Sequence, residues 1–242
     1  MTIRGEATVI PLYTARRSNP PVPVAFAGTA FFIAPELLVT CWHCVREPLS
    51  SDCGYLALVM QGAGYVDWLY NISQDQNGSD LATANLRGKP EFQFLLASER
   101  ALQGVDFSCF GYPFSGTRLD QLGSPKATLE ARLFKGYVMR TFTFDYPSFG
   151  PTLSYELSFP APPGLSGAPM IEMNKRRILG VVYGNNDVAT TEHLAEVDSD
   201  GSRTPEVQRI VSFGLAHHTA TLRDLAGAAT NGRPLLELVK SG

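Results

Sequence analysis

The sequence predicts an all-β protein built from antiparallel strands. Its apolar segments are short, rich in Val, Phe, Tyr and Thr, and separated by clusters of Gly, Pro, Asn and Ser, which is typical of many strands joined by turns. Helical patterns between these segments are almost absent, which disfavours a parallel sheet and favours barrels or sandwiches. The predicted strands cover residues 6–13, 24–33, 37–41, 55–60, 65–72, 81–86, 105–112, 127–138, 140–146, 152–159, 168–173, 177–184 and 209–216.

Only the C-terminal part of the chain has a helical pattern. We expect a helix over Thr219–Ala229, capped by Thr219 or Thr221, and one further turn over Leu235–Val239. The segment from Asn185 to Glu206 is long and mainly acidic, and we predict a solvated loop there.

Composition limits the class of protein and of partner. The 242 residues are 44% hydrophobic with no long apolar run, which excludes a disordered chain, collagen and a membrane-spanning helix. This length fits one or two domains with a sizeable core. Twenty basic and 23 acidic residues leave a net charge of −3, so we expect neither nucleic acid nor a membrane as partner.

The cysteines and the N-terminus favour a reducing compartment. Cys41, Cys44, Cys53 and Cys109 are too few and too irregularly spaced for a disulfide framework, and we expect reduced thiols. Glu6 interrupts what would be the apolar core of a signal peptide. We therefore expect a cytoplasmic protein.

Three segments carry the residue types of a serine nucleophile system. His43 lies in a turn after a strand, Asp80 opens a buried strand, and Ser166 lies in Gly-Leu-Ser-Gly-Ala-Pro. A hydroxyl needs a base to remove its proton, and that imidazole needs a carboxylate to fix its tautomer. The backbone N–H groups of Gly164 and Ser166 can converge on an oxyanion. Each feature alone has an ordinary structural explanation, so the prediction depends on their joint occurrence.

The combination resembles the trypsin-like (chymotrypsin-fold) serine peptidases over nearly the whole chain. The motifs that carry the resemblance are Gly-Thr-Ala-Phe-Phe-Ile, Thr-Cys-Trp-His-Cys, Asp-Leu-Ala, Gly-Leu-Ser-Gly-Ala-Pro and Leu-Gly-Val-Val-Tyr-Gly. The resemblance implies two six-stranded antiparallel β-barrels with a C-terminal helix. An N-terminal barrel within residues 1–103 would carry His43 and Asp80, and a C-terminal barrel within residues 104–242 would carry Ser166. It also implies an endopeptidase that needs no cofactor or metal and acts on a protein or peptide.

Two departures from the family pattern concern regulation. Leu165 stands where digestive members have an aspartate that captures a new N-terminus, and Cys44 has no cysteine near Gly28 to pair with. Both departures resemble stand-alone intracellular bacterial peptidase domains. We therefore expect control by an activating protein partner rather than by propeptide cleavage, as in bacterial defence or stress pathways.

The resemblance also places the substrate-binding residues. Pro160 occupies the position six before the serine, where trypsin has an acidic residue, and the facing wall would be Val182, Tyr183, Gly184 and Asn185. An extended substrate would pair with the backbone of this wall. We expect a small or apolar residue before the cleaved bond, although Asp187 could still reach the rim.

Three other interpretations remain. Gly164–Ala168 approaches the nucleophile elbow of α/β-hydrolases, but Pro169 and a strand follow it instead of a helix. Cys41 and Cys44 form a Cys-x-x-Cys pair, but no second ligand pair lies nearby except His217–His218, and buried free thiols are favoured. The third is a peptidase-fold binding module without useful turnover. If Asp80 were not the orienting acid, Asp67 or Asp106 would be the alternatives.

Overall fold

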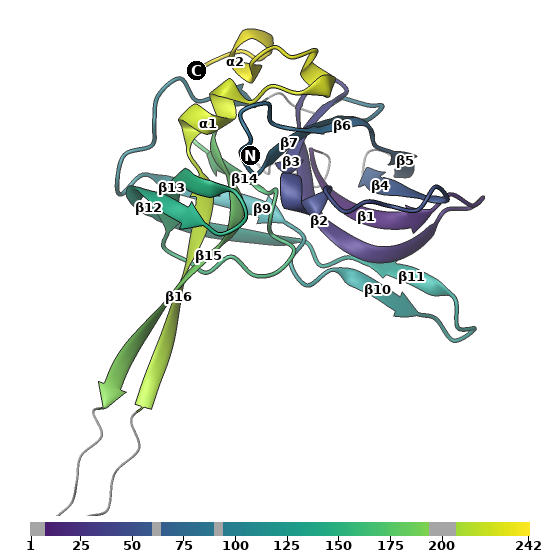
Figure 1. Cartoon of the computed structure of the whole chain (residues 1–242), viewed down its shortest axis with the longest axis horizontal. Helices are drawn as coiled ribbons and strands as arrows, with labels where there is room; N and C mark the ends of the chain where they lie inside the picture. The colour runs from purple at the N-terminus through teal and green to yellow at the C-terminus, as the bar shows by residue number, and fades with distance from the viewer. Residues whose placement is uncertain (1–7, 60–63, 90–93, 194–206) are drawn as a thin grey trace, which may run out of the picture.

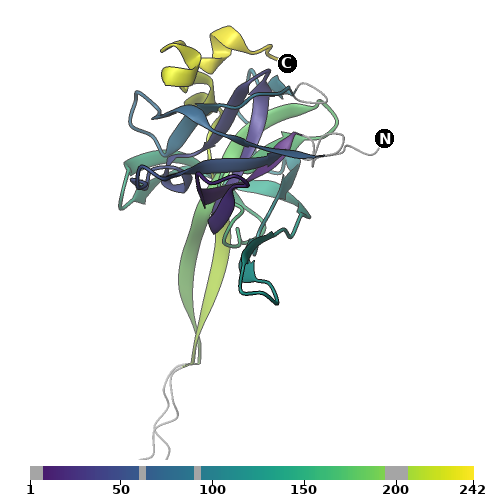
Figure 2. The same cartoon turned by 90° about the vertical axis from the view of Figure 1, so that its right-hand side faces the viewer.

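The computed structural model describes residues 8–59, 64–89, 94–193 and 207–242. These residues form two β-barrels side by side, with short helices at the C-terminal end and a long hairpin that projects away from the barrels (Figures 1 and 2). Within these residues, no helix has the length and apolar character needed to cross a membrane.

The first sheet closes into a six-stranded barrel. Its strand order is β5-β4-β1-β2-β3-β7-β6, and only Leu69 separates β5 from β6, so one bent strand forms both ends of the sheet. All described pairings in it are antiparallel. The strands are β1 (Val9–Arg16), β2 (Val22–Ala34), β3 (Leu37–Cys41), β4 (Cys53–Val59), β5 (Tyr65–Trp68), β6 (Tyr70–Gln74) and β7 (Leu81–Asn85).

The second sheet closes through an additional pairing between β14 and β15. The predicted all-β double barrel is thus confirmed. Strand β8 (Leu95–Leu96) adds to β15 in parallel, and the small hairpin of β10 (Gly116–Leu119) and β11 (Pro125–Thr128) lies outside both barrels. The ring strands are β9 (Asp106–Gly111), β12 (Arg132–Tyr146), β13 (Gly150–Leu157), β14 (Pro169–Glu172), β15 (Arg177–His193) and β16 (Val207–His217).

The two barrels share an interface near their cores. The first core cluster, which contains Phe31 and Leu81, also includes Tyr183 and Leu215 from β15 and β16. The predicted domain boundary at residue 103 remains a prediction, since β8 precedes it and pairs with the second sheet.

The C-terminal helix is shorter than predicted. It is α1 (Thr219–Asp224), followed by the 3₁₀ turn η3 (Ala228–Thr230) and α2 (Leu235–Leu238). The cap is not Thr219 or Thr221 but His218, whose Nδ1 accepts from the N–H of Ala220 at 3.1 Å. The helix ends before Gly227, where a Cβ would lie 2.6 Å from Oγ1 of Thr83, so only glycine allows this close approach to the first barrel.

The predicted loop from Asn185 to Glu206 is wrong for its first part. Strand β15 continues to His193 and pairs with β16, which begins at Val207, while residues 194–206 lie outside the described residues. This paired part of β15 and β16, which we call the arm, contains cross-strand pairs such as Val188↔Val211 and Ala189↔Ile210. Antiparallel pairing satisfies the hydrogen bonds of the backbone N–H and C=O groups without burying the side chains. A mainly acidic composition is therefore compatible with strands as well as with a loop.

Candidate active site

His43 and Asp80 are brought together by the pairing of β3 with β7. The register Cys41↔Leu81 sets Asp80 beside the 3₁₀ turn η2 (Trp42–Cys44), which carries His43. The carboxylate accepts from the backbone N–H of His43 at 2.8 Å and contacts its Nδ1 at 2.6 Å. The N–H of Trp42 donates to the carbonyl of Asp80 at 3.0 Å. One residue therefore fixes both the turn and the imidazole ring.

Burial and hydrogen bonding set the charges of this pair. Burial would raise the pKa of Asp80, which is 1% exposed, but His217 and His43 outweigh it and hold that pKa below its usual value. Burial would likewise lower the pKa of His43, yet hydrogen bonds to Asp80 and Cys44 outweigh it and raise the pKa to about 10. Asp80 is thus an anion that keeps a proton on Nδ1 of His43.

The turn around Ser166 leaves two backbone donors free. The neighbouring backbone N–H groups all donate to carbonyl oxygens: Leu165 to Pro162 at 3.1 Å, Ala168 to Leu165 at 3.0 Å, and Gly167 to Val182 at 2.8 Å. Within the described part of the chain, the N–H groups of Gly164 and Ser166 donate no hydrogen bond. These are the two groups that the sequence predicts for an oxyanion hole.

Close contact with the first barrel requires glycine on both sides of this serine. Gly167 has a φ of +88°, and a Cβ there would lie 1.8 Å from the carbonyl oxygen of Thr29. Gly164 has a φ of +91°, and its Cβ would lie 2.8 Å from Cε1 of Phe26, on strand β2 of the first barrel. Thr29 holds the turn through its N–H to the Ser166 carbonyl at 2.9 Å and its hydroxyl to the Gly164 carbonyl at 2.8 Å. The first barrel therefore positions the loop of the second.

Leu165 anchors the same turn in the second barrel. Its side chain is fully buried in the second core cluster, and a Cβ at Gly111 would lie 2.7 Å from its Cδ1. Burying a leucine stabilises a fold by roughly 2 kcal/mol. This apolar contact holds the loop in the second barrel.

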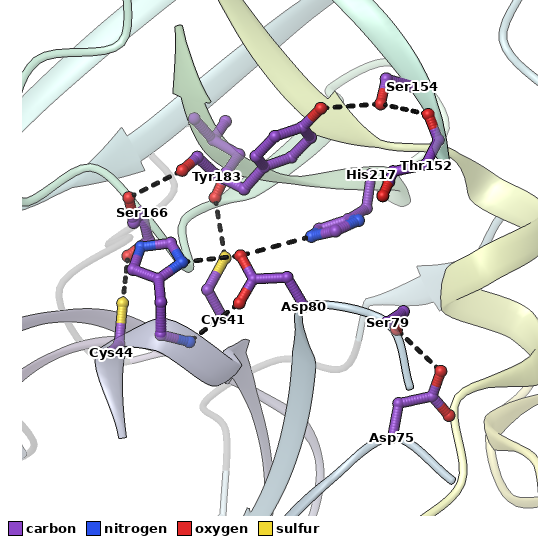
Figure 3. A network of polar contacts seen from close by, with 12 residues as sticks. Cys41, Cys44, Asp75, Ser79, Asp80, Thr152, Ser154, Ser166, Tyr183 and His217 are labelled. Carbon is purple, nitrogen blue, oxygen red and sulfur yellow. Dashed lines mark hydrogen bonds and ion pairs between the residues drawn. The ribbon is translucent and has the colours of Figure 1, made fainter. Parts of the chain in front are cut away.

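Ser166 lies next to the histidine-bearing turn. Its carbonyl oxygen is 3.7 Å from the Sγ of Cys44, and its hydroxyl donates to the carbonyl of Tyr183 at 3.2 Å (Figure 3). Among the described groups, that carbonyl is the acceptor of the hydroxyl, rather than the imidazole of His43.

The predicted substrate wall has two kinds of residue. The backbone carbonyl of Val182 already accepts two hydrogen bonds within the protein, from the N–H of Gly167 at 2.8 Å and from the thiol of Cys41 at 3.2 Å. Asn185 instead reaches across to Ala161, accepting from its N–H at 2.6 Å and donating to its carbonyl at 3.0 Å. Tyr183 is buried, Gly184 is half-buried and Pro160 is exposed. The side chain of Asn185 therefore links the strand that carries the wall to the segment that contains Pro160.

The four cysteines are free thiols, and the predicted burial of Cys41 and Cys44 is confirmed. Gly28 lies beside Cys44, since a Cβ at Gly28 would be 2.6 Å from the Cys44 Sγ. The position from which a second cysteine could form a disulfide with Cys44 is therefore occupied by glycine. Asp67 pairs with Arg87 at 3.9 Å, and Asp106 is exposed. Neither of these acids replaces Asp80 beside His43.

One cluster has the ligand types of a metal site. Donor atoms of Cys41, Asp80 and His217 lie within 4.8 Å of one another, and all three residues are buried. Burial raises the pKa of the Cys41 thiol well above its usual value, and the Asp80 carboxylate is already bonded to His43. Both features oppose a metal. The sequence did not indicate that His217 contacts Asp80, because only the packing of the two barrels brings them together.

Several solved structures with a similar fold are described as proteases. The Rv3671c protease from M. tuberculosis in its active form matches with a TM-score of 0.56 and 17% identity, over 89% of this chain and 77% of that chain. Its inactive form matches with a TM-score of 0.55 and 18% identity, over 89% and 85%. The MamO protease domain from Magnetospirillum magneticum gives a TM-score of 0.55 and 11% identity, over 89% and 94%.

The chain has the trypsin-like protease fold. No protein-family model and no curated protein sequence matches the chain. At identities of 11% to 18% the likeness concerns the fold, and the chemistry must be inferred from this chain's own side chains. In this trypsin-like fold, η2 and Asp80 lie on the first barrel, and the Ser166 turn precedes β14 of the second.

Proposed function

We propose that this chain is a serine endopeptidase that hydrolyses peptide bonds of a protein substrate through an acyl-enzyme. The supporting observation is the 2.6 Å contact between Nδ1 of His43 and Oδ2 of Asp80, on a turn that packs against the Ser166 carbonyl through Cys44. A carboxylate on Nδ1 makes Nε2 the nitrogen that gains and loses a proton, and His43 acts as a general base when Nε2 is unprotonated.

In the proposed mechanism, Nε2 of His43 takes the proton from the Ser166 hydroxyl while Oγ forms a bond to the substrate carbonyl carbon. The carbonyl oxygen becomes an oxyanion, which accepts from the N–H groups of Gly164 and Ser166. His43 then gives its proton to the leaving amine as the peptide bond breaks. A water molecule repeats the cycle on the ester, releasing the acid and restoring Ser166. Asp80 remains ionised throughout.

The predicted preference for a small or apolar residue before the cleaved bond remains part of the proposal. Pro160 offers no charge to a Lys or Arg side chain, and the double hydrogen bond between Asn185 and Ala161 narrows the space between the two walls. The first feature favours an uncharged side chain, and the second favours a short one.

Regulation by a protein partner is the second part of the proposal. The Ser166 hydroxyl must leave the carbonyl of Tyr183 and turn to His43 before it can react. A partner or substrate that occupies the Tyr183 carbonyl would favour this rotation. The same contact also supports the alternative candidate, a catalytically weak binding module in a bacterial defence or stress pathway. In either case we place the protein in the cytoplasm, acting on a polypeptide rather than on nucleic acid or a membrane.

The test is N-terminal profiling of a lysate treated with the wild type or with Ser166→Ala. Peptide N-termini that arise only with the wild type, with a shared small or apolar residue before the cut, would support the endopeptidase. Identical sets of N-termini from both proteins would contradict it and favour the binding module.

A further inference from the structure

A second imidazole faces Asp80 from the opposite barrel. His217, the last residue of β16, is fully buried, and its Nε2 lies 3.9 Å from Oδ2 of Asp80 (Figure 3). Neither of its ring nitrogens has a hydrogen-bond partner among the described residues. A buried imidazole must carry a proton on at least one nitrogen, and a buried donor without an acceptor is costly. The Asp80 carboxylate, 3.9 Å from Nε2, is an acceptor on the side to which this nitrogen points.

The surroundings fix the ring in this orientation. It packs on the ring of Tyr183 with centroids 4.5 Å apart, and the Tyr183 hydroxyl is held by Ser154 at 2.8 Å. The backbone of His217 pairs with both Val181 and Ser154. A Cβ at Gly180 would lie 2.3 Å from the His217 carbonyl oxygen, so the strand approaches closely only because residue 180 is glycine. The side chain therefore has little freedom to turn away from Asp80.

The carboxylate has capacity for this donor. Its Oδ1 accepts from the backbone N–H of His43 and its Oδ2 from Nδ1 of the same residue, and each oxygen has two lone-pair positions. A shortening of about 1 Å from the present separation would give a hydrogen bond of ordinary length. Because the site excludes water, such a bond would be stronger than one at the surface.

We propose that His217 is a positioning residue that donates its Nε2–H to Asp80 and thereby holds the carboxylate toward His43. This role rests on the proposed serine endopeptidase function. It links the two barrels, because Asp80 belongs to the first and His217 to the second. The orientation of the imidazole at His43 then depends on how closely the barrels pack.

The donor also sets the strength of the His43–Asp80 pair. A second hydrogen bond draws negative charge from the carboxylate, so Asp80 attracts the proton of His43 less strongly. Removing the donor therefore raises the pKa of His43. The other titratable groups that face this pair are Cys41 from β3, Cys44 from η2, Tyr183 from β15 and Tyr146 from β12.

The test compares His217→Leu, which removes the donor, with His217→Gln, which keeps an N–H at a similar reach. For His217→Leu we expect kcat to fall about tenfold or more, by analogy with the loss of the outer hydrogen-bond partners of metal-binding histidines, with KM little changed. The acid limb of the pH–rate profile should move to higher pH. His217→Gln should restore most of both properties.

His218→Leu is the matched control. His218 is also buried and also packs on a tyrosine, with ring centroids 4.6 Å from Tyr155, but no carboxylate faces it in the described structure. It caps α1, so its loss should lower stability while leaving the pH profile unchanged. A purely structural role of His217 would give the same result as this control, which would overturn the proposal.

A measurement without turnover separates this inference from the proposed function. In ¹⁵N-histidine NMR spectra of the wild type, His217 should show its proton on Nε2, and the titration midpoint of His43 should rise in His217→Leu. A proton on Nδ1 of His217, or an unchanged midpoint for His43, would overturn the inference. If the wild type cleaved no peptide but His217 carried its proton on Nε2 and His217→Leu raised the midpoint of His43, only the endopeptidase function would be contradicted.

Discussion

Asp80 accepts hydrogen bonds from two groups of His43, its backbone N–H at 2.8 Å and its Nδ1 at 2.6 Å. The first bond fixes the 3₁₀ turn that carries the imidazole, and the second fixes its tautomer. The acid is 1% exposed, so water does not compete for either bond. The geometry that activates Ser166 in the proposed mechanism therefore depends on this one carboxylate.

Asp80→Asn should keep the fold and lose about 10⁴-fold in kcat, because an amide donor would stabilise the wrong imidazole tautomer. The measurement is hydrolysis of a fluorogenic peptide, with circular dichroism to check folding. Asp67→Asn is the control, since Asp67 pairs with Arg87 away from His43. Near-normal activity in Asp80→Asn would mean that another group orients His43.

The same pair should make stability depend on pH. The pKa of His43 is raised in the folded state, so the stability it contributes is complete below its unfolded value of about 6.5. That contribution is lost as the pH rises through about 10. Urea unfolding across this range should show a steeper decline for the wild type than for Asp80→Asn. Parallel curves would contradict the shift.

Cys44→Ala should move the acid limb of the pH–rate profile to lower pH. The neighbouring Cys41 and His43 side chains lower the pKa of Cys44 against the effect of burial, and Cys44 in turn helps to raise the pKa of His43. Without the thiol, His43 loses its proton at lower pH and becomes a base sooner. Cys109→Ala is the control, because Cys109 is buried in the other core. An unchanged limb would show that Cys44 does not act on His43.

Gly167→Ala should abolish a functional Ser166 turn. The new Cβ would lie 1.8 Å from the Thr29 carbonyl oxygen, in addition to the backbone strain of a φ of +88°. Gly104→Ala isolates the strain, since its φ is +83° and nothing lies within 4 Å. We expect about 1 kcal/mol of destabilisation for Gly104→Ala and clearly more for Gly167→Ala, measured by urea unfolding. Equal losses would contradict the role given to Thr29.

Asn185→Ala should broaden the preference for the residue before the cleaved bond. The substitution removes both hydrogen bonds to Ala161, so larger apolar side chains should fit between the two walls. Cleavage of a peptide library reports the change. The matched control is Asn186→Ala, because Asn186 bonds Glu156 at 3.0 Å instead. The same preference in wild type and Asn185→Ala would place the specificity elsewhere.

Local sequence signals predicted the parts of the site that depend on local backbone geometry. The glycines beside Ser166 and the turn at His43 reflect requirements of a few neighbouring residues, and the strands follow from apolar periodicity. The prediction also divided strand β12 near Met139, and the structure has an irregular register between Val138 and Arg140 within one continuous strand. Short-range patterns therefore locate the irregular register in β12, but they do not show that the strand continues through it.

Features set by contacts between distant segments could not be predicted in this way. The approach of His217 to Asp80 depends on how two barrels pack, and the cap at His218 depends on where β16 ends. The paired part of the arm beyond Asn185 depends on cross-strand partners, which composition does not reveal. In each case the decisive neighbour is far away in the sequence.

The most direct test of the central claim is labelling with a fluorophosphonate probe, which reacts with an activated serine. We expect a covalent adduct that mass spectrometry locates on Ser166, absent in Ser166→Ala and much slower to form in Asp80→Asn. The reaction should be run on the purified wild type and in lysate, which supplies protein partners. A wild type that stays unlabelled in both, while trypsin in the same samples is labelled, would contradict the account.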